Sequence, residues 1–225
     1  CVISMADFAE ARDMVMALKN KYWIDGLYSY KGIQKRVCFH SREIRGRKDA
    51  FNPDIIDYKS FVADLSQLMA AIPMCIYASH IDKERHVNQY IHPIEPYDLC
   101  MTFVLERILR DLPVNQNCVI ILESRGAKED RAVLDFIKGL IDNGTRFHPA
   151  SHFSRIKGVY FNPKWCKAAD DRMSYWELEL ADLCAYPIQK FFVYGTMDLA
   201  FQVILPKLSH YPDHMGKGLK SFPIT

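Results

Sequence analysis

Two acidic residues stand in sequence surroundings that could support chemistry, and Glu123 is the first of them. It follows residues 119–122, a run of four apolar residues that predicts a buried strand, and polar residues come directly after it. Open α/β sheets bind their ligands at the carboxyl ends of strands. Glu123 is therefore a candidate functional acid, and a surface ion pair with Arg125 is the alternative.

Asp182 is the second acid, and it lies in the mostly apolar segment YWELELADLCAYPIQKFF. Its neighbours three and four positions away include Leu178, Ala185 and Tyr186, so a helix would place it on or beside the buried stripe. An isolated carboxylate there costs several kcal/mol, and it needs a cation or hydrogen bonds. Asp182 either belongs to a functional site or pairs with an arginine and organises packing.

A divalent metal ion would make two neighbouring carboxylates tolerable. Mg²⁺ and Mn²⁺ prefer oxygen ligands, and two such ions about 4 Å apart are a common device for cleaving phosphodiester bonds. Glu123 and Asp182 are therefore candidate ligands for Mg²⁺ or Mn²⁺ and candidate catalytic residues, whereas spacing alone favours structural pairing of Asp182.

The motif HSREIR at residues 40–45 forms a compact polar group after a short apolar run. His40 and Glu43 are candidates for proton transfer. Arg42 and Arg45 are candidates for binding substrate, because guanidinium groups match phosphate in a bidentate manner. A loop of surface ion pairs is the alternative.

Further charged residues follow Glu123 and occupy a later basic stretch. Arg125 and Lys128 could contact substrate, whereas Asp130 would favour the N-terminus of the next helix. His148 and His152 lie in a basic stretch that could contact nucleic acid, or could be a solvated loop. Zinc binding is disfavoured there, because no cysteine or further histidine completes a ligand set nearby.

The periodicity of apolar residues predicts a three-layer α/β domain in which helices alternate with strands. We expect one domain over residues 1–225, with inserted loops at 40–56 and 82–96. Expected strands are 37–39, 74–78, 119–122 and 156–161. Expected helices are 6–23, 57–72, 95–112, 128–143, 174–192 and 198–208, with Ser174 capping the fifth and Pro187 kinking it.

Composition restricts the class of protein. The 225 residues are 49% hydrophobic and carry a net charge of +2, so any contact with nucleic acid must come from a local patch. Seven cysteines without a CxxC pair fit a reducing compartment. The sequence has no stretch of about eighteen apolar residues, so we expect a cytoplasmic protein without a membrane partner.

Four segments resemble an uncharacterised bacterial and phage family, the domain of unknown function numbered three thousand eight hundred, which is regarded as ribonuclease H-like. They are HSREIR (40–45), ILESRGAKED (121–130), LELADLCAY (178–186) and KGLKSFP (217–223). The resemblance implies a mixed central sheet of about five strands flanked by helices. It also implies metal-binding acids on the fourth strand and the last core helix, which Glu123 and Asp182 match. Glu106 matches a further acid that some ribonuclease H-like enzymes carry.

The family's first strand, Asp-Glu-Ser-Gly, has no counterpart in the sequence. We expect this strand to precede Cys1 in the natural protein; the alternative is an inactive member. The leading hypothesis is a metal-dependent nuclease with a nucleic-acid partner, either DNA or RNA. The rival is a catalytically inactive module of the same fold that binds nucleic acid or a protein partner. A homo-oligomer is compatible with the sequence.

Overall fold

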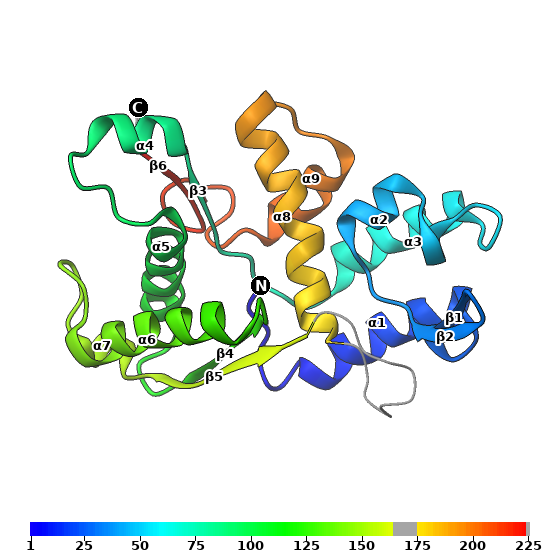
Figure 1. Ribbon diagram of the computed structural model, residues 1–225, viewed down its shortest axis with the longest axis horizontal. Helices are drawn as coiled ribbons and strands as arrows, with labels where there is room; N and C mark the ends of the chain where they lie inside the picture. Colours follow the sequence, from blue (N-terminus) through cyan, green and yellow to red (C-terminus); the bar gives the residue numbers. More distant parts are fainter. Residues whose placement is uncertain (164–174, 224–225) are drawn as a thin grey trace. The chain divides into compact units, whose positions relative to one another are not determined.

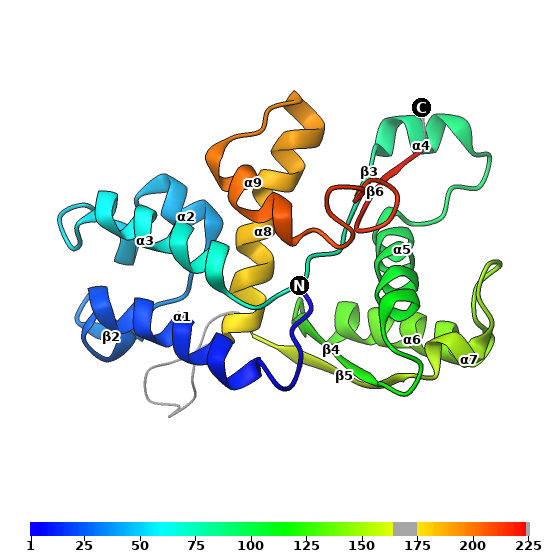
Figure 2. The same cartoon turned by 180° about the vertical axis from the view of Figure 1, so that it is seen from behind.

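The computed structural model describes residues 1–163 and 175–223, and the chain divides into two compact units (Figures 1 and 2). Unit 1 contains Cys1–Cys75 and Pro163–Lys207, and unit 2 contains Ile76–Asn162 and Leu208–Thr225. Each unit is therefore built from two stretches that are distant in the sequence. The mixed α/β class predicted from the sequence is confirmed.

Unit 1 is mainly helical. Its longer helices are α1 (Phe8–Tyr22), α3 (Tyr58–Ala71) and α8 (Trp176–Tyr194). Shorter helices are η1 (Ile24–Gly26), α2 (Ser41–Gly46), η2 (Asp49–Phe51), α9 (Leu199–Ile204) and η4 (Leu205–Lys207). The strands β1 (Leu27–Tyr30) and β2 (Ile33–Arg36) form an antiparallel hairpin.

An aromatic cluster fills the core of unit 1. The ring of Trp23 lies 6.5 Å from that of Phe39, 5.6 Å from Phe51 and 5.4 Å from Phe61, measured between centroids. Such tilted and edge-to-face pairs add to the free energy gained by burying apolar area. The cluster joins α3 to the segment 37–39, which leads into the candidate site.

Unit 2 combines helices with two parallel strand pairs. Its helices are α4 (Lys83–Gln89), α5 (Pro96–Asp111), α6 (Ala127–Asn143) and α7 (Ala150–Phe153). Strand β4 (Cys118–Glu123) pairs with β5 (Ile156–Asn162), and β3 (Ala78–Ile81) pairs with β6 (Leu219–Phe222). The buried cluster of this unit comprises Leu105, Leu109, Ile137, Leu140, Phe153 and Ile156.

The predicted helices are present with shifted ends. Asp57 caps α3 by accepting the Ser60 N–H, and Glu95 caps α5, whose first residue is Pro96. Helix α8 continues past Pro187 to Tyr194. The predicted cap Ser174 lies outside the described residues. The two intervals expected to be loops also contain helices, α2 and η2 within residues 40–56 and α4 within residues 82–96.

The strand predictions need correction. Within the described ranges the strands form three separate two-stranded sheets, so the expected central sheet of about five strands is not confirmed. Val119 of β4 is 51% exposed, so this strand is not buried on both faces. Residues 37–39 are buried but belong to no sheet, and the strand expected at 74–78 begins only at Ala78.

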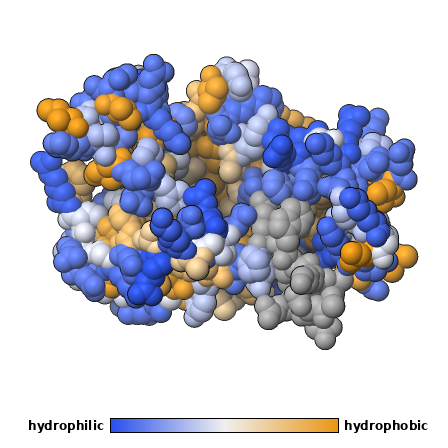
Figure 3. All heavy atoms as spheres, in the orientation of Figure 1, coloured by the Kyte–Doolittle hydropathy of each residue, from blue (hydrophilic) through white to orange (hydrophobic). Residues whose placement is uncertain are grey.

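The visible surface is mostly hydrophilic, with apolar side chains in small separate groups (Figure 3). Ile24 and Ile91 are among the exposed apolar residues. None of the helices in the described part of the chain is both long and apolar enough to span a bilayer.

Candidate functional site

Two acids on α8 bind the backbone of residues 39–41 in unit 1, where an extended segment leads into α2. A Glu179 carboxylate oxygen, Oε2, accepts the Phe39 N–H at 2.8 Å, and Asp182 Oδ2 accepts the Ser41 N–H at 2.7 Å. Residues three apart share a helix face, and alternate residues of an extended chain repeat the same orientation. The two carboxylates therefore take the place of a neighbouring strand, which explains why residues 37–39 are buried without joining a sheet.

Glu179 is also half of a buried ion pair with Lys19. Lys19 Nζ lies 2.8 Å from Glu179 Oε1 and 2.7 Å from Oε2, and it donates to the Val37 carbonyl at 2.9 Å. The two side chains are 1% and 0% exposed. Buried charges are tolerated when they are paired and hydrogen-bonded. Glu179 therefore has a structural function, and it fixes the chain immediately before His40.

Asp182 lies at the surface end of this arrangement, beside His40. Each side chain is 25% exposed, and His40 Nδ1 lies 3.7 Å from Asp182 Oδ2. His40 also caps α2, because its Nδ1 accepts the Arg42 N–H at 3.2 Å. This hydrogen bond assigns the proton of the neutral ring to Nε2. An acid from α8 and an imidazole from the HSREIR motif thus meet across 142 positions of sequence.

The basic residues of the same motif extend the site. Arg45 Cζ lies 3.3 Å from the ring centroid of Tyr186, and Arg45 Nε donates to Ser41 Oγ at 3.4 Å. Both contact groups are uncharged, so they orient the guanidinium without neutralising it. Arg42 and Arg45 are exposed, and Glu43 lies half-buried in the first turn of α2. The structure therefore brings Asp182 together with the predicted residues of the HSREIR motif.

Glu123 belongs to unit 2, where it is exposed at the last position of β4 and pairs with Asn162 of β5. The next residues are organised by Asp130, which accepts from Ser124 Oγ at 2.5 Å and from the Arg125 N–H at 2.8 Å. The Ser124 hydrogen bond lowers the pKa of Asp130. Asp130 thus serves the N-terminus of α6, as the sequence predicts.

Arg125 and Lys128, which were predicted to contact substrate, lie just before α6 and in its first turn. Lys128 lies exposed in the first turn of α6. The Arg125 guanidinium carbon lies 5.2 Å from the ring centroid of Tyr97 on α5. An aromatic ring orients this cation as well, although the distance is longer than in the Arg45–Tyr186 pair.

Glu106 is buried on α5 of unit 2. Its Oε1 accepts the Thr145 hydroxyl at 2.7 Å, which ties α5 to the turn after α6. The backbone oxygen of Glu106 accepts from His152 Nε2 at 3.3 Å, and burial lowers the pKa of His152. The ring of His148 stacks on that of His152 with centroids 4.3 Å apart. These contacts give Glu106 and both histidines a role in packing.

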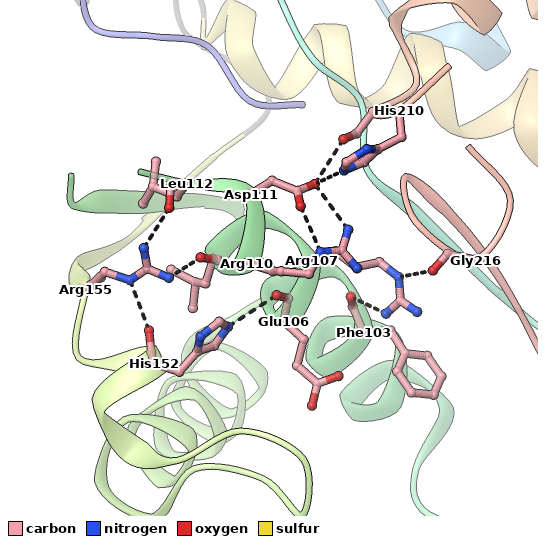
Figure 4. A network of polar contacts seen from close by, with 12 residues as sticks. Phe103, Glu106, Arg107, Arg110, Asp111, Leu112, His152, Arg155, His210 and Gly216 are labelled. Atoms are coloured by element: carbon pink, nitrogen blue, oxygen red, sulfur yellow. Dashed lines mark hydrogen bonds and ion pairs between the residues drawn. The ribbon is translucent and has the colours of Figure 1, made fainter. Parts of the chain in front are cut away.

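Arginines complete the polar network around the C-terminal part of α5 (Figure 4). Arg155 donates to the carbonyl groups of Leu109 and Leu112, where helix carbonyls otherwise have no partner. Arg107 Nε donates to the Gly216 carbonyl at 3.1 Å. The Glu106 carboxylate points away from these arginines in Figure 4.

The candidate metal ligands are distributed over both units, with Asp182 in unit 1 and Glu106 and Glu123 in unit 2. Residues 1–163 and 175–223 contain no group of three or more His, Cys, Asp or Glu side chains arranged to hold a metal ion. Glu179 does not suit this role, because Lys19 and the Phe39 amide already occupy its oxygens. Asp182, in contrast, is 25% exposed.

Comparisons with protein-family models, with curated proteins and with solved structures found no match.

Three residues of the site were not predicted from the sequence, namely Lys19, Glu179 and Tyr186. A signal for the first two was present. In the expected helix 6–23, Lys19 lies four positions after the apolar residue Val15. In the expected helix 174–192, Glu179 lies three positions before Asp182. Opposite charges on two apolar helix faces indicate a buried pair. Nothing in the sequence indicated that Tyr186 would contact Arg45.

Proposed function

We propose that the chain is a metal-dependent nuclease that hydrolyses phosphodiester bonds, with the ribonuclease H-like fold that its motifs resemble. One observation carries the proposal: the partly exposed Asp182 lies 3.7 Å from His40 and accepts the Ser41 N–H, in the motif that also contains the exposed cations Arg42 and Arg45. Two of the segments that resemble the family therefore meet in one site.

The residue types suit phosphodiester chemistry. Arg42 and Arg45 provide planar donors that match phosphate oxygens, and preorganised charge of this kind stabilises a transition state. His40 is held as a hydrogen-bond acceptor at Nδ1, so its Nε2 proton is the one offered to a substrate oxygen. Glu43, in the first turn of α2, is the second candidate for proton transfer.

Asp182 would hold Mg²⁺ or Mn²⁺, because a carboxylate oxygen is the ligand these ions prefer. A bound ion would stabilise charge on the phosphoryl group and make its water a better nucleophile. Glu123 is proposed as a second metal ligand because it matches the acid of the family's fourth strand. Glu106 is the weaker candidate, because its carboxylate already accepts a hydrogen bond from Thr145. Arg125 and Lys128 are proposed to contact the nucleic acid.

A non-catalytic module that binds nucleic acid is the second candidate. It is favoured by the hydrogen bond from the Ser41 N–H to Asp182, since this acid already has a structural function. The two candidates differ in whether Asp182 is needed for cleavage or only for the conformation of residues 40–41.

The test is cleavage of single-stranded, double-stranded and hybrid nucleic acids by the purified chain with Mg²⁺, Mn²⁺ or EDTA. Asp182→Asn should reduce metal-dependent cleavage at least about a hundredfold. Its folding should be unaffected, because the Asn oxygen can still accept the Ser41 N–H. The control is Asp142→Asn, an exposed acid of α6. Cleavage that survives Asp182→Asn, or no metal-dependent cleavage by the wild type, contradicts the proposal.

A further inference from the structure

The β1–β2 hairpin of unit 1 carries basic residues and no acid of its own. Residues 27–36, LYSYKGIQKR, contain Lys31, Lys35 and Arg36 and no acid. Lys31 and Gly32 form its two-residue turn, with φ of 51° and 76°, which is the conformation that tight hairpins favour. Both lysines are exposed.

The ring of Tyr30 gathers the two lysines in one place. Lys35 Nζ lies 4.2 Å from the ring centroid, and Lys31 Nζ lies 5.4 Å from it. An aromatic ring attracts cations but does not cancel their charge. Two ammonium groups near one ring repel each other, and a bound anion would relieve this repulsion. A cation–π contact with Tyr30 explains the position of either lysine taken singly. It does not explain why two cations share one ring.

The hairpin is joined directly to the candidate site. Strand β2 ends at Arg36, four residues before His40. A chain spans at most about 3.6 Å per residue, so the Cα atoms of these two residues lie within about 14 Å of each other. The connection is fixed, because the Val37 N–H donates to the Gly26 carbonyl at 2.8 Å and the Phe39 N–H donates to Glu179. Lys35 is five residues before His40, so by the same limit their Cα atoms lie within about 18 Å of each other, and a single strand bound at Lys31 and Lys35 can extend to His40.

We infer that Lys31 and Lys35, gathered by Tyr30, bind the phosphodiester backbone of a nucleic acid and hold it beside the Asp182 site. The second half of this inference rests on the proposed function, whereas the first does not. Single-stranded nucleic acids are bound by combinations of cations and aromatic rings of this kind.

The test is a salt titration of binding, with Asp182→Asn as the background so that no substrate is cleaved. Binding of labelled single-stranded DNA, single-stranded RNA and duplex DNA is followed by fluorescence anisotropy. Each phosphate contact to a single strand contributes about 0.7 to the slope of log affinity against log salt. Lys31→Gln combined with Lys35→Gln should therefore reduce the slope by about 1.4, whereas Tyr30→Ala should weaken binding and Tyr30→Phe should not.

The matched control replaces two exposed lysines elsewhere, Lys59→Gln with Lys138→Gln, and should leave the slope unchanged. A hairpin variant with the slope of this control overturns the inference. So does a dependence on Lys31 and Lys35 that is found for anionic lipid vesicles and not for any nucleic acid. If the wild type cuts nothing while the hairpin variants still lose binding, the proposed function fails and the hairpin assignment stands. Circular dichroism establishes that each variant is folded.

Discussion

The buried Lys19–Glu179 pair predicts that Glu179→Gln is severely destabilising. The substitution preserves shape but leaves the Lys19 ammonium, which is 1% exposed, without its counter-charge. Removing one partner of a buried ion pair costs about 3–5 kcal/mol of unfolding free energy. Folded proteins are stable by about 5–15 kcal/mol, so the variant should lose a large part of its stability.

The assay is equilibrium denaturation by urea, followed by circular dichroism. The matched control is Glu177→Gln, two positions earlier in α8. Burial raises the pKa of Glu177, which means that its charge is disfavoured in the folded state, so Glu177→Gln should not lower the free energy of unfolding. The reasoning is refuted if Glu179→Gln is no more destabilising than this control.

A double-mutant cycle separates the pair from its surroundings. Lys19→Met combined with Glu179→Met removes both charges, so its destabilisation should be smaller than the sum of the two single changes by at least about 1 kcal/mol. Stability should not return fully, because the Val37 carbonyl and the Phe39 N–H each lose a partner. Simple additivity would contradict the account.

Three further predictions concern other parts of the fold. Burial disfavours the ionised form of Asp111, but hydrogen bonds from Arg110, Tyr77 and Ser209 outweigh it and lower the pKa to about 2. This stabilisation is present above the unfolded pKa near 4 and is lost as the pH falls toward about 2. Asp111→Asn should therefore remove roughly 2 kcal/mol of unfolding free energy at neutral pH and make stability less dependent on pH between about 4 and 2. Gly144→Ala should lower the stability measured in thermal melts by at least about 2 kcal/mol, because φ is 72° and the added Cβ would lie 2.4 Å from the His148 carbonyl oxygen. Gly139→Ala, in open space within α6, should instead raise the stability by about 0.5–1 kcal/mol. Tyr186→Ala should raise the KM of cleavage severalfold by releasing Arg45, and Tyr186→Phe should not; equal effects would exclude the ring contact as the cause.

Local signals predicted the helices well. The apolar periodicity of α3, α5 and α6 is contained within a few helical turns, so it could be recognised without tertiary information. The short helices α2 and α4 were missed, because their polar composition resembles that of loops.

Strand pairing could not be predicted in the same way. Residues 37–39 have the composition of a buried strand, but their amide and carbonyl groups bond Glu179 and Lys19, which lie far away in the sequence. Such long-range partners leave no periodic pattern. The apolar run 119–122 indicated a strand correctly, but it could not reveal that β4 would pair only with β5 among the described strands.

Only some residues of the candidate site were predicted, and their arrangement was not. Asp182 and His40 were each identified from their own surroundings, yet their contact depends on how α8 packs against the segment 37–41. Glu179 and Asp182 stand in the same apolar segment, so the sequence does not distinguish their roles. Burial, 0% against 25% exposure, and the ion pair with Lys19 distinguish the structural acid from the functional candidate.

The most direct test of the central claim is metal-dependent cleavage by the wild-type chain, compared with Asp182→Asn under conditions where both are folded. The account predicts that Mg²⁺ or Mn²⁺ supports cleavage by the wild type, and that the variant binds nucleic acid but does not cut it. A folded variant that cuts as well as the wild type would contradict the assignment of Asp182.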